Sequence, residues 1–104
     1  MKKGTLSLSE VAAADIVEQA DWYREQSGPA LAKRGEKAVT LALLQIVDHP
    51  RAGSICNFQH SELSDVRRVP VPRFPKHLIF FQVRGTEMLV LRVLHGAPDL
   101  ETLL

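Results

Sequence analysis

Apolar residues recur at helical spacing in a first long stretch of the chain, between residues 10 and 27. Ser9 precedes this stretch and is a residue type that caps helix N-termini, and the acidic Glu10 follows it where the helix dipole favours a carboxylate. The residues that share the apolar face are Ala12, Ile16, Ala20 and Tyr23. The pattern therefore predicts an amphipathic helix that begins at Ser9.

A second stretch repeats the helical spacing between residues 30 and 48. Its apolar stripe consists of Leu31, Ala38, Ala42 and Ile46. His49-Pro50 predicts its end, because the residue before a proline is pushed out of the helical region. Gly28 suits a left-handed helix end and Pro29 suits the first turn of the next helix. Two helices with so short a break predict an antiparallel hairpin.

Four other stretches have the alternation or the apolar run of a strand, and residues 51–63 between them have little periodicity and predict a loop. The predicted strands are Thr5–Ser9, Asp65–Val71, Lys76–Val83 and Met88–Leu94, with residues 84–87 as the connection between the last two. The order is strand, helix, helix, strand, strand, strand. We therefore expect one α+β domain over residues 1–104, in which an N-terminal strand and an antiparallel helical hairpin pack on an antiparallel β-sheet.

Composition narrows the class of protein. Hydrophobic residues make up 45% and charged residues 24%, which is typical of a soluble globular chain. No apolar run approaches the roughly 18 residues of a membrane span, so we expect a cytoplasmic protein without a membrane partner. Cys56 is the only cysteine, which excludes an internal disulfide and a cysteine-built zinc site.

The charge is uneven along the chain, although the net charge is only +1. Between Val66 and His95 there are six basic side chains and one acidic side chain, a net charge of +5. This excess favours an anionic or acidic partner. A basic solvated face that acids elsewhere in the fold balance is the alternative.

Basic residues on the last three strands raise the question of an active site. Arg68, Lys76 and Arg92 could hold phosphates, and His95 could move protons in RNA cleavage. Strand alternation places Arg92 and His95 on opposite faces unless a one-residue bulge lies near them. We interpret His95 as a structural joint at the strand end and His77 as a surface residue of its strand. We expect neither a metal nor a cofactor.

Two aromatic residues adjoin on the first predicted helix. Tyr23 continues the apolar stripe, so Trp22 lies at its border or outside it. Trp22 either packs against the flank of the hairpin or is exposed as a contact for another chain.

The element order and two stretches, Leu-Ile-Phe-Phe-Gln-Val at 78–83 and Leu-Arg-Val-Leu-His-Gly-Ala-x-Asp at 91–99, resemble the ParE family of bacterial toxins, within the ParE/RelE superfamily of type II toxin-antitoxin systems. The resemblance implies a gyrase inhibitor that a ParD-like antitoxin neutralises in a hetero-oligomer. It also implies no sequence-specific binding of nucleic acid. An acidic antitoxin segment is expected to wrap the helical hairpin and the sheet edge.

The resemblance also directs the choice of contact residues. Those expected to bind the target are Arg67, Arg68, Arg92, His95 and Asp99. Those expected to bind the antitoxin are Trp22, Tyr23, Leu31 and Phe80.

Two alternatives remain open at this point. The RelE-like branch cuts messenger RNA on the ribosome, and Arg68, Lys76, Arg92 and His95 would be its catalytic residues here. Pro98 stands where the family usually has arginine, which favours altered tail contacts. A degenerate toxin that only binds antitoxin is therefore the third hypothesis.

Overall fold

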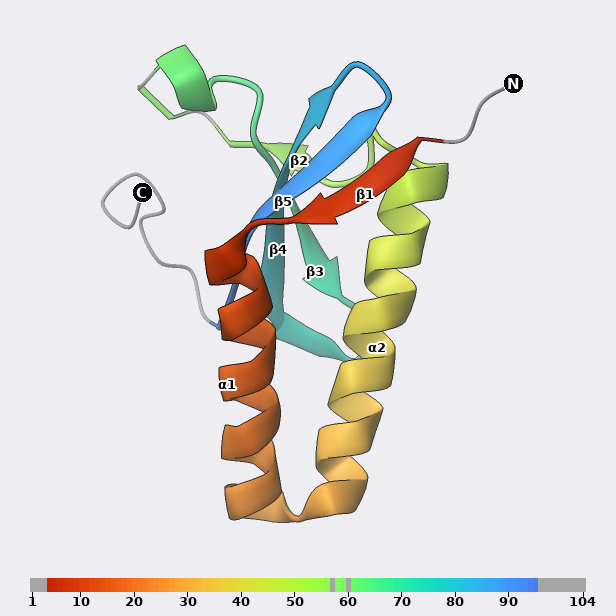
Figure 1. The fold of residues 1–104 in the computed structure, drawn as a ribbon, viewed down its shortest axis with the longest axis vertical. Helices are drawn as coiled ribbons and strands as arrows, with labels where there is room; N and C mark the ends of the chain where they lie inside the picture. The colour runs from red at the N-terminus through yellow and green to blue at the C-terminus, as the bar shows by residue number, and fades with distance from the viewer. Residues whose placement is uncertain (1–3, 57, 60, 96–104) are drawn as a thin grey trace.

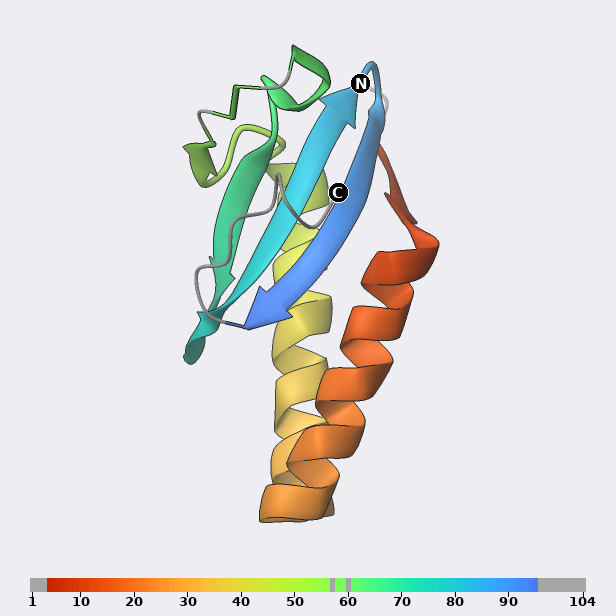
Figure 2. The same ribbon diagram turned by 90° about the vertical axis from the view of Figure 1, so that its left-hand side faces the viewer.

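The computed structural model describes residues 4–56, 58–59 and 61–95, and these form a helical layer packed on a β-sheet. The helices are α1 (Glu10–Ser27) and α2 (Pro29–Asp48), with a short 3-10 helix at Ser61–Leu63. The strands are β1 (Thr5–Leu8), β2 (Ser54–Ile55), β3 (Arg67–Val71), β4 (Phe74–Arg84) and β5 (Glu87–His95). Figures 1 and 2 show α1 and α2 side by side on one face of the sheet, with the hairpin tip extending beyond it.

The sheet has the strand order β1-β5-β4-β3-β2. The predicted α+β fold is confirmed, but the sheet is mixed because β1 runs parallel to β5 while the other pairs are antiparallel. Parallel neighbours need a long connection, and here the helical hairpin and three further strands supply it. β2 is a two-residue strand within the stretch expected to be a loop, and it pairs with the start of β3.

Local signals set the helix boundaries as predicted. The Ser9 side chain accepts a hydrogen bond from the Ala12 backbone N–H at 3.0 Å and caps α1. Gly28 has a φ of 87°, and Pro29 directly begins α2. Helix α2 ends at Asp48, with His49 as its C-cap. One glycine therefore reverses the chain and makes the antiparallel hairpin.

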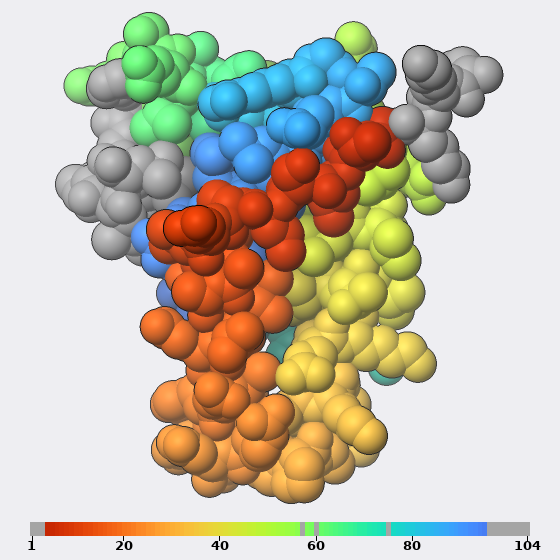
Figure 3. Space-filling view, in the orientation of Figure 1, coloured from red at the N-terminus to blue at the C-terminus, as the bar shows by residue number. Residues whose placement is uncertain are grey.

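The main core lies between the hairpin and the sheet. Its buried members come from both helices and from β3, β4 and β5. They are Ala12, Ala42, Leu43, Ile46, Val71, Ile79, Phe81, Met88, Val90 and Val93. Figure 3 shows the outer surface of the two helices, with β1 crossing above them.

A second, smaller cluster covers part of the other face of the sheet. Phe80 of β4 is buried there with Cys56 and Val66, and the 3-10 helix contributes Leu63. The helices therefore shield one face, and Cys56, Leu63 and Val66 cover part of the face that sequence reasoning left open. Burial on this face removes apolar area that a partner would otherwise need to cover.

Strand β5 contains a bulge. Phe81 pairs with Val90, whereas Phe80 pairs with Arg92, so Leu91 is an extra residue opposite Phe80. Directly opposed side chains lie on the same side of a sheet. The Arg92 side chain therefore leaves the backbone on the same side of the sheet as Phe80, which is the side away from the helices. Farther along β5, the regular alternation resumes.

Candidate functional site

Polar side chains of α1 and its cap close the edge of β5 beyond the end of β1. Ser9 Oγ donates to the Leu91 carbonyl at 2.8 Å, and Gln19 Nε2 donates to the Val93 carbonyl at 2.6 Å. The Asp15 carboxylate accepts from the Val93 backbone N–H at 3.0 Å. Since these backbone groups are satisfied within the chain, this part of the edge offers no template for an added strand.

Arg92 is fixed by the same helix. Its Nε and Nη2 donate to the two carboxylate oxygens of Asp15 at 2.8 and 2.9 Å. The side chains are 16% (Arg92) and 9% (Asp15) exposed. The hydrogen bond to Asp15 is the main cause that raises the pKa of Arg92. This geometry contradicts the interpretation of Arg92 as a cation that is open to phosphate or to a target, because its bidentate fork already holds a carboxylate.

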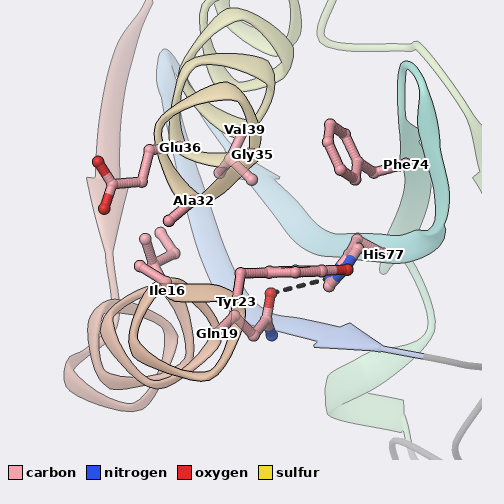
Figure 4. A pocket seen from close by; sticks show the side chains of 10 residues that line it. Ile16, Gln19, Tyr23, Ala32, Gly35, Glu36, Val39, Phe74 and His77 are labelled. Atoms are coloured by element: carbon pink, nitrogen blue, oxygen red, sulfur yellow. Dashed lines mark hydrogen bonds between the residues drawn. The ribbon is translucent and has the colours of Figure 1, made fainter. Parts of the chain in front are cut away.

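His77 lies in the interior at the start of β4, and its expected surface position is wrong. Its side chain is buried because it lies on the same side of the sheet as Ile79 and contacts α1 there. Gln19 Oε1 accepts from His77 Nδ1–H at 3.0 Å, so Nε2 is the acceptor for the Tyr23 hydroxyl at 2.5 Å. Figure 4 shows Gln19 and Tyr23 of α1 directed at His77. Burial, and secondly the neighbouring His95, lower the pKa of His77 and favour this neutral form.

His95 is exposed at the end of β5 and packs on His77. The two residues are cross-strand partners, and their ring centroids are 4.8 Å apart in an edge-to-face arrangement. His95 therefore faces the helix side, opposite to the starting side of Arg92, as the alternation predicted. The interpretation of His95 as a joint that directs the tail stays a prediction, because the tail lies outside the described residues.

The remaining basic candidates do not meet His95. Arg68 is cross-strand to Phe80 and lies away from the helices, while Arg67 is cross-strand to Phe81 and donates to the Arg51 carbonyl at 3.0 Å. Lys76 is exposed and precedes His77, so it also points away from the helices. The four residues of the nuclease hypothesis are thus divided between two faces.

The predicted antitoxin contacts have different environments. Trp22 is 56% exposed and stacks edge-on against Tyr23, with ring centroids 5.1 Å apart. Leu31 is half-buried on α2. Phe80 is only 2% exposed in the second cluster, so the structure contradicts its use as a contact. Asp99, a predicted target contact, lies outside the described residues.

A groove runs between α2 and the β3–β4 turn. Arg34 and Lys37 of α2 and Arg73 of the turn contribute its positive charge, and its volume is about 680 Å³. The apolar residues that line it include Leu31, Ala38, Leu41 and Phe74. Arg73 has a φ of 70°, in the left-handed region that few side chains adopt without strain. We call this surface the α2 groove.

Sequence reasoning missed Asp15 and Gln19. Both belong to the face of α1 that also carries Ala12, Ile16 and Tyr23, so a polar residue within an apolar stripe was the available signal. Such residues need partners when they are buried.

The described residues include no group of three His, Cys, Asp or Glu placed to hold a metal ion. Within them, no helix has the length and apolarity to cross a membrane.

Comparisons with known proteins agree with this architecture. The model of a family described as "ParE toxin of type II toxin-antitoxin system, parDE" matches residues 6–100. A solved structure of the chromosomal ParDE TA system from P. aeruginosa superposes with a TM-score of 0.75 at 21% identity, covering 91% of this chain and 98% of that one. No curated protein matches. The solved structure shows the same fold, and the family match covers most of the sequence. The chain therefore belongs to the ParE toxin family of type II toxin-antitoxin systems.

Proposed function

We propose that this protein is a cytoplasmic toxin that inhibits DNA gyrase and that a ParD-like antitoxin neutralises it. The observation that carries the proposal is membership of the ParE family across residues 6–100. The protein acts by binding, without a cofactor. Its partners are the antitoxin and the gyrase, and neither contact requires sequence-specific binding of nucleic acid.

The geometry gives little support to ribonuclease chemistry. Acid–base cleavage needs phosphate-binding and proton-transferring groups within hydrogen-bond reach of one substrate. Arg68 and Lys76 point away from the helices, His95 faces them, and Arg92 is held by Asp15. An inhibitor has no such requirement, because separate contacts can all contribute to one protein interface.

We assign the antitoxin contact to the α2 groove. Arg34, Lys37 and Arg73 can pair with carboxylates, while Leu31 and Leu41 can receive apolar side chains. Leu41 is 51% exposed and adds apolar surface to the α2 groove. An acidic amphipathic segment has the matching chemistry. The backbone of Arg73 lies in the left-handed region, where a glycine or asparagine would form the turn with less strain. This is consistent with a role for the charge of Arg73.

The target contact is a separate surface in this proposal. Arg68 is exposed on β3 and His95 is exposed at the end of β5. Arg67 contributes less, because its guanidinium already donates to the Arg51 carbonyl. Asp99 completes the predicted set from the tail.

Induction in bacterial cells tests the function. We expect DNA synthesis to fall before protein synthesis, and the purified protein to reduce gyrase supercoiling. Early loss of translation with gyrase unaffected would instead support the ribonuclease. Normal growth, together with tight antitoxin binding, would support the degenerate toxin.

Matched variants separate the two surfaces. Arg68→Ala is expected to weaken gyrase inhibition while antitoxin binding is retained, whereas Arg34→Ala is expected to do the reverse. Lys33→Ala, an exposed cation that does not line the α2 groove, is the control for general charge loss. If Lys33→Ala weakened antitoxin binding as much as Arg34→Ala, the assignment to the α2 groove would be wrong.

A further inference from the structure

A second groove lies between α1 and the neighbouring ends of β4 and β5. Its volume is about 320 Å³, and it is lined by Glu18, Gln19, Trp22, Tyr23, His77 and His95. The antitoxin hypothesis used Trp22 and Tyr23 and the nuclease hypothesis used His95, but neither used Glu18 or the groove that these rings form with it. We call it the α1 groove.

The walls of the α1 groove are held in place before any ligand arrives. The Tyr23 hydroxyl donates a hydrogen bond to His77 Nε2, and His77 Nδ1–H donates one to Gln19 Oε1. Gln19 Nε2 in turn donates a hydrogen bond to the Val93 carbonyl. The rings of Trp22 and His95 pack edge-on against Tyr23 and His77, respectively. A ligand therefore meets ordered aromatic surfaces, so less conformational entropy is lost on binding.

The charge of the α1 groove favours a cation. Glu18 is an exposed carboxylate at the groove, and Arg92, whose charge also interacts with Glu18, is held by two hydrogen bonds to Asp15. Burial lowers the pKa of His77, with a second contribution from His95, so its ring is neutral at neutral pH. Trp22 is 56% exposed, and indole is the aromatic ring that attracts cations most strongly.

We propose that the α1 groove binds an arginine side chain presented by a partner protein. The guanidinium stacks on the indole of Trp22 and donates hydrogen bonds to the carboxylate of Glu18. Arginine fits better than lysine, because its planar group can stack and pair with a carboxylate at the same time. The α2 groove has the opposite charge, so the two grooves receive chemically different segments.

Trp22 makes the test direct, because it is the only tryptophan of the chain. The probe is the capped tripeptide acetyl-Gly-Arg-Gly-amide, titrated into the full-length protein while Trp22 fluorescence and the indole N–H resonance are followed. The matched probes carry lysine or neutral citrulline in place of arginine. We expect a saturable change with the arginine peptide, a weaker one with lysine and none with citrulline.

Variants locate the binding site. Glu18→Gln is expected to weaken binding of the arginine peptide by about three- to tenfold, as loss of one charge-assisted contact implies. Glu10→Gln, at the far end of α1, is expected to leave binding unchanged. Trp22→Leu is followed through the ring resonances of His95 and is expected to abolish saturation. Equal responses to the three peptides, or unchanged affinity in Glu18→Gln, would overturn the proposal. Because purified protein and peptide suffice, failure here leaves the proposed toxin function untouched.

Discussion

Replacement of Asp15 by alanine tests how α1 is attached to the sheet. The carboxylate accepts two hydrogen bonds from Arg92 and one from the Val93 backbone N–H. Asp15→Ala removes all three at once and leaves the guanidinium of Arg92, whose side chain is only 16% exposed, without its hydrogen-bonded carboxylate. We therefore expect a large loss of stability from one side chain.

The size of the loss follows from the burial of the pair. Removal of one partner from a buried ion pair costs about 3–5 kcal/mol, because the other charge is left uncompensated. The low exposure of both side chains makes this pair similar to a buried ion pair. The partial access of water to Arg92 places the expected loss of stability at the lower end of that range. We expect about 3 kcal/mol, a large fraction of the roughly 5–15 kcal/mol that stabilises a typical domain.

Urea unfolding followed by circular dichroism measures this loss. With a slope of about 1.5 kcal/mol per molar urea, the midpoint of Asp15→Ala should fall by roughly 2 M. Asp21→Ala is the matched control, because Asp21 on the same helix pairs with Arg24 at 2.9 Å while both side chains are more than half exposed. That variant should lose about 0.5 kcal/mol or less. Equal midpoints for the two variants would refute the structural role of Asp15.

A double variant separates the cost of the unpaired Arg92 guanidinium from the cost of the lost Val93 hydrogen bond and lost packing. Arg92→Met in the Asp15→Ala background removes the unpaired guanidinium while keeping an apolar stem. Apolar replacement of a complete buried pair is often close to neutral, so the double variant should recover part of the lost stability. If it were less stable than Asp15→Ala alone, the cost would come from Val93 and from packing, and the reasoning about charge would be wrong.

Three further predictions follow from single positions. Burial, and secondly the charge of His95, lower the pKa of His77 below its ordinary value of 6.5. As the pH falls, the unfolded chain therefore takes up a proton at His77 before the folded chain does. Stability should therefore decrease as the pH falls below 6.5, and urea midpoints at pH 8 and 5.5 should differ less in His77→Gln than in the exposed control His49→Gln. Gly53 has a φ of 76°, and an added Cβ would lie 2.1 Å from the Arg68 carbonyl. Gly53→Ala should thus lower the thermal midpoint, whereas Gly35→Ala, in open space within α2, should raise stability by about 0.5–1 kcal/mol. Arg73→Asn should relieve the left-handed strain and preserve or raise the thermal midpoint, yet weaken antitoxin binding measured by calorimetry. Unchanged binding would argue against the α2 groove.

The helical hairpin could be predicted because its signals are local. Ser9 caps α1, Gly28 and Pro29 join the helices, and Pro50 follows the end of α2. Each of these acts within a few residues of its position in the sequence. Alternation and apolar runs predicted the order of the elements along the chain, which the structure confirms apart from the short β2, whereas the parallel pairing of β1 with β5 was not predicted.

The polar contacts could not be predicted because they join distant residues. Asp15 meets Arg92 across 77 positions, and Gln19 meets His77 across 58. His77 was assigned to the surface as a common position for a strand histidine, because nothing near it in the sequence shows that Gln19 and Tyr23 of α1 lie against it. The bulge opposite Phe80 has no glycine or other local signal, so the faces of β5 became clear only in three dimensions.

The edges of the sheet decide where a partner can dock. β1 and β2 are the outer strands, with four and two residues, and short edge strands are poor templates for strand addition. Beyond β2, the outer edge of β3 contains Pro70, which has no backbone N–H to donate. An antitoxin segment should therefore rely on the α2 groove more than on strand pairing. Hydrogen exchange in the complex should slow within α2 and the turn at Arg73, with little change in β1. Strong new protection along β1, with α2 unaffected, would place the antitoxin at the sheet edge instead.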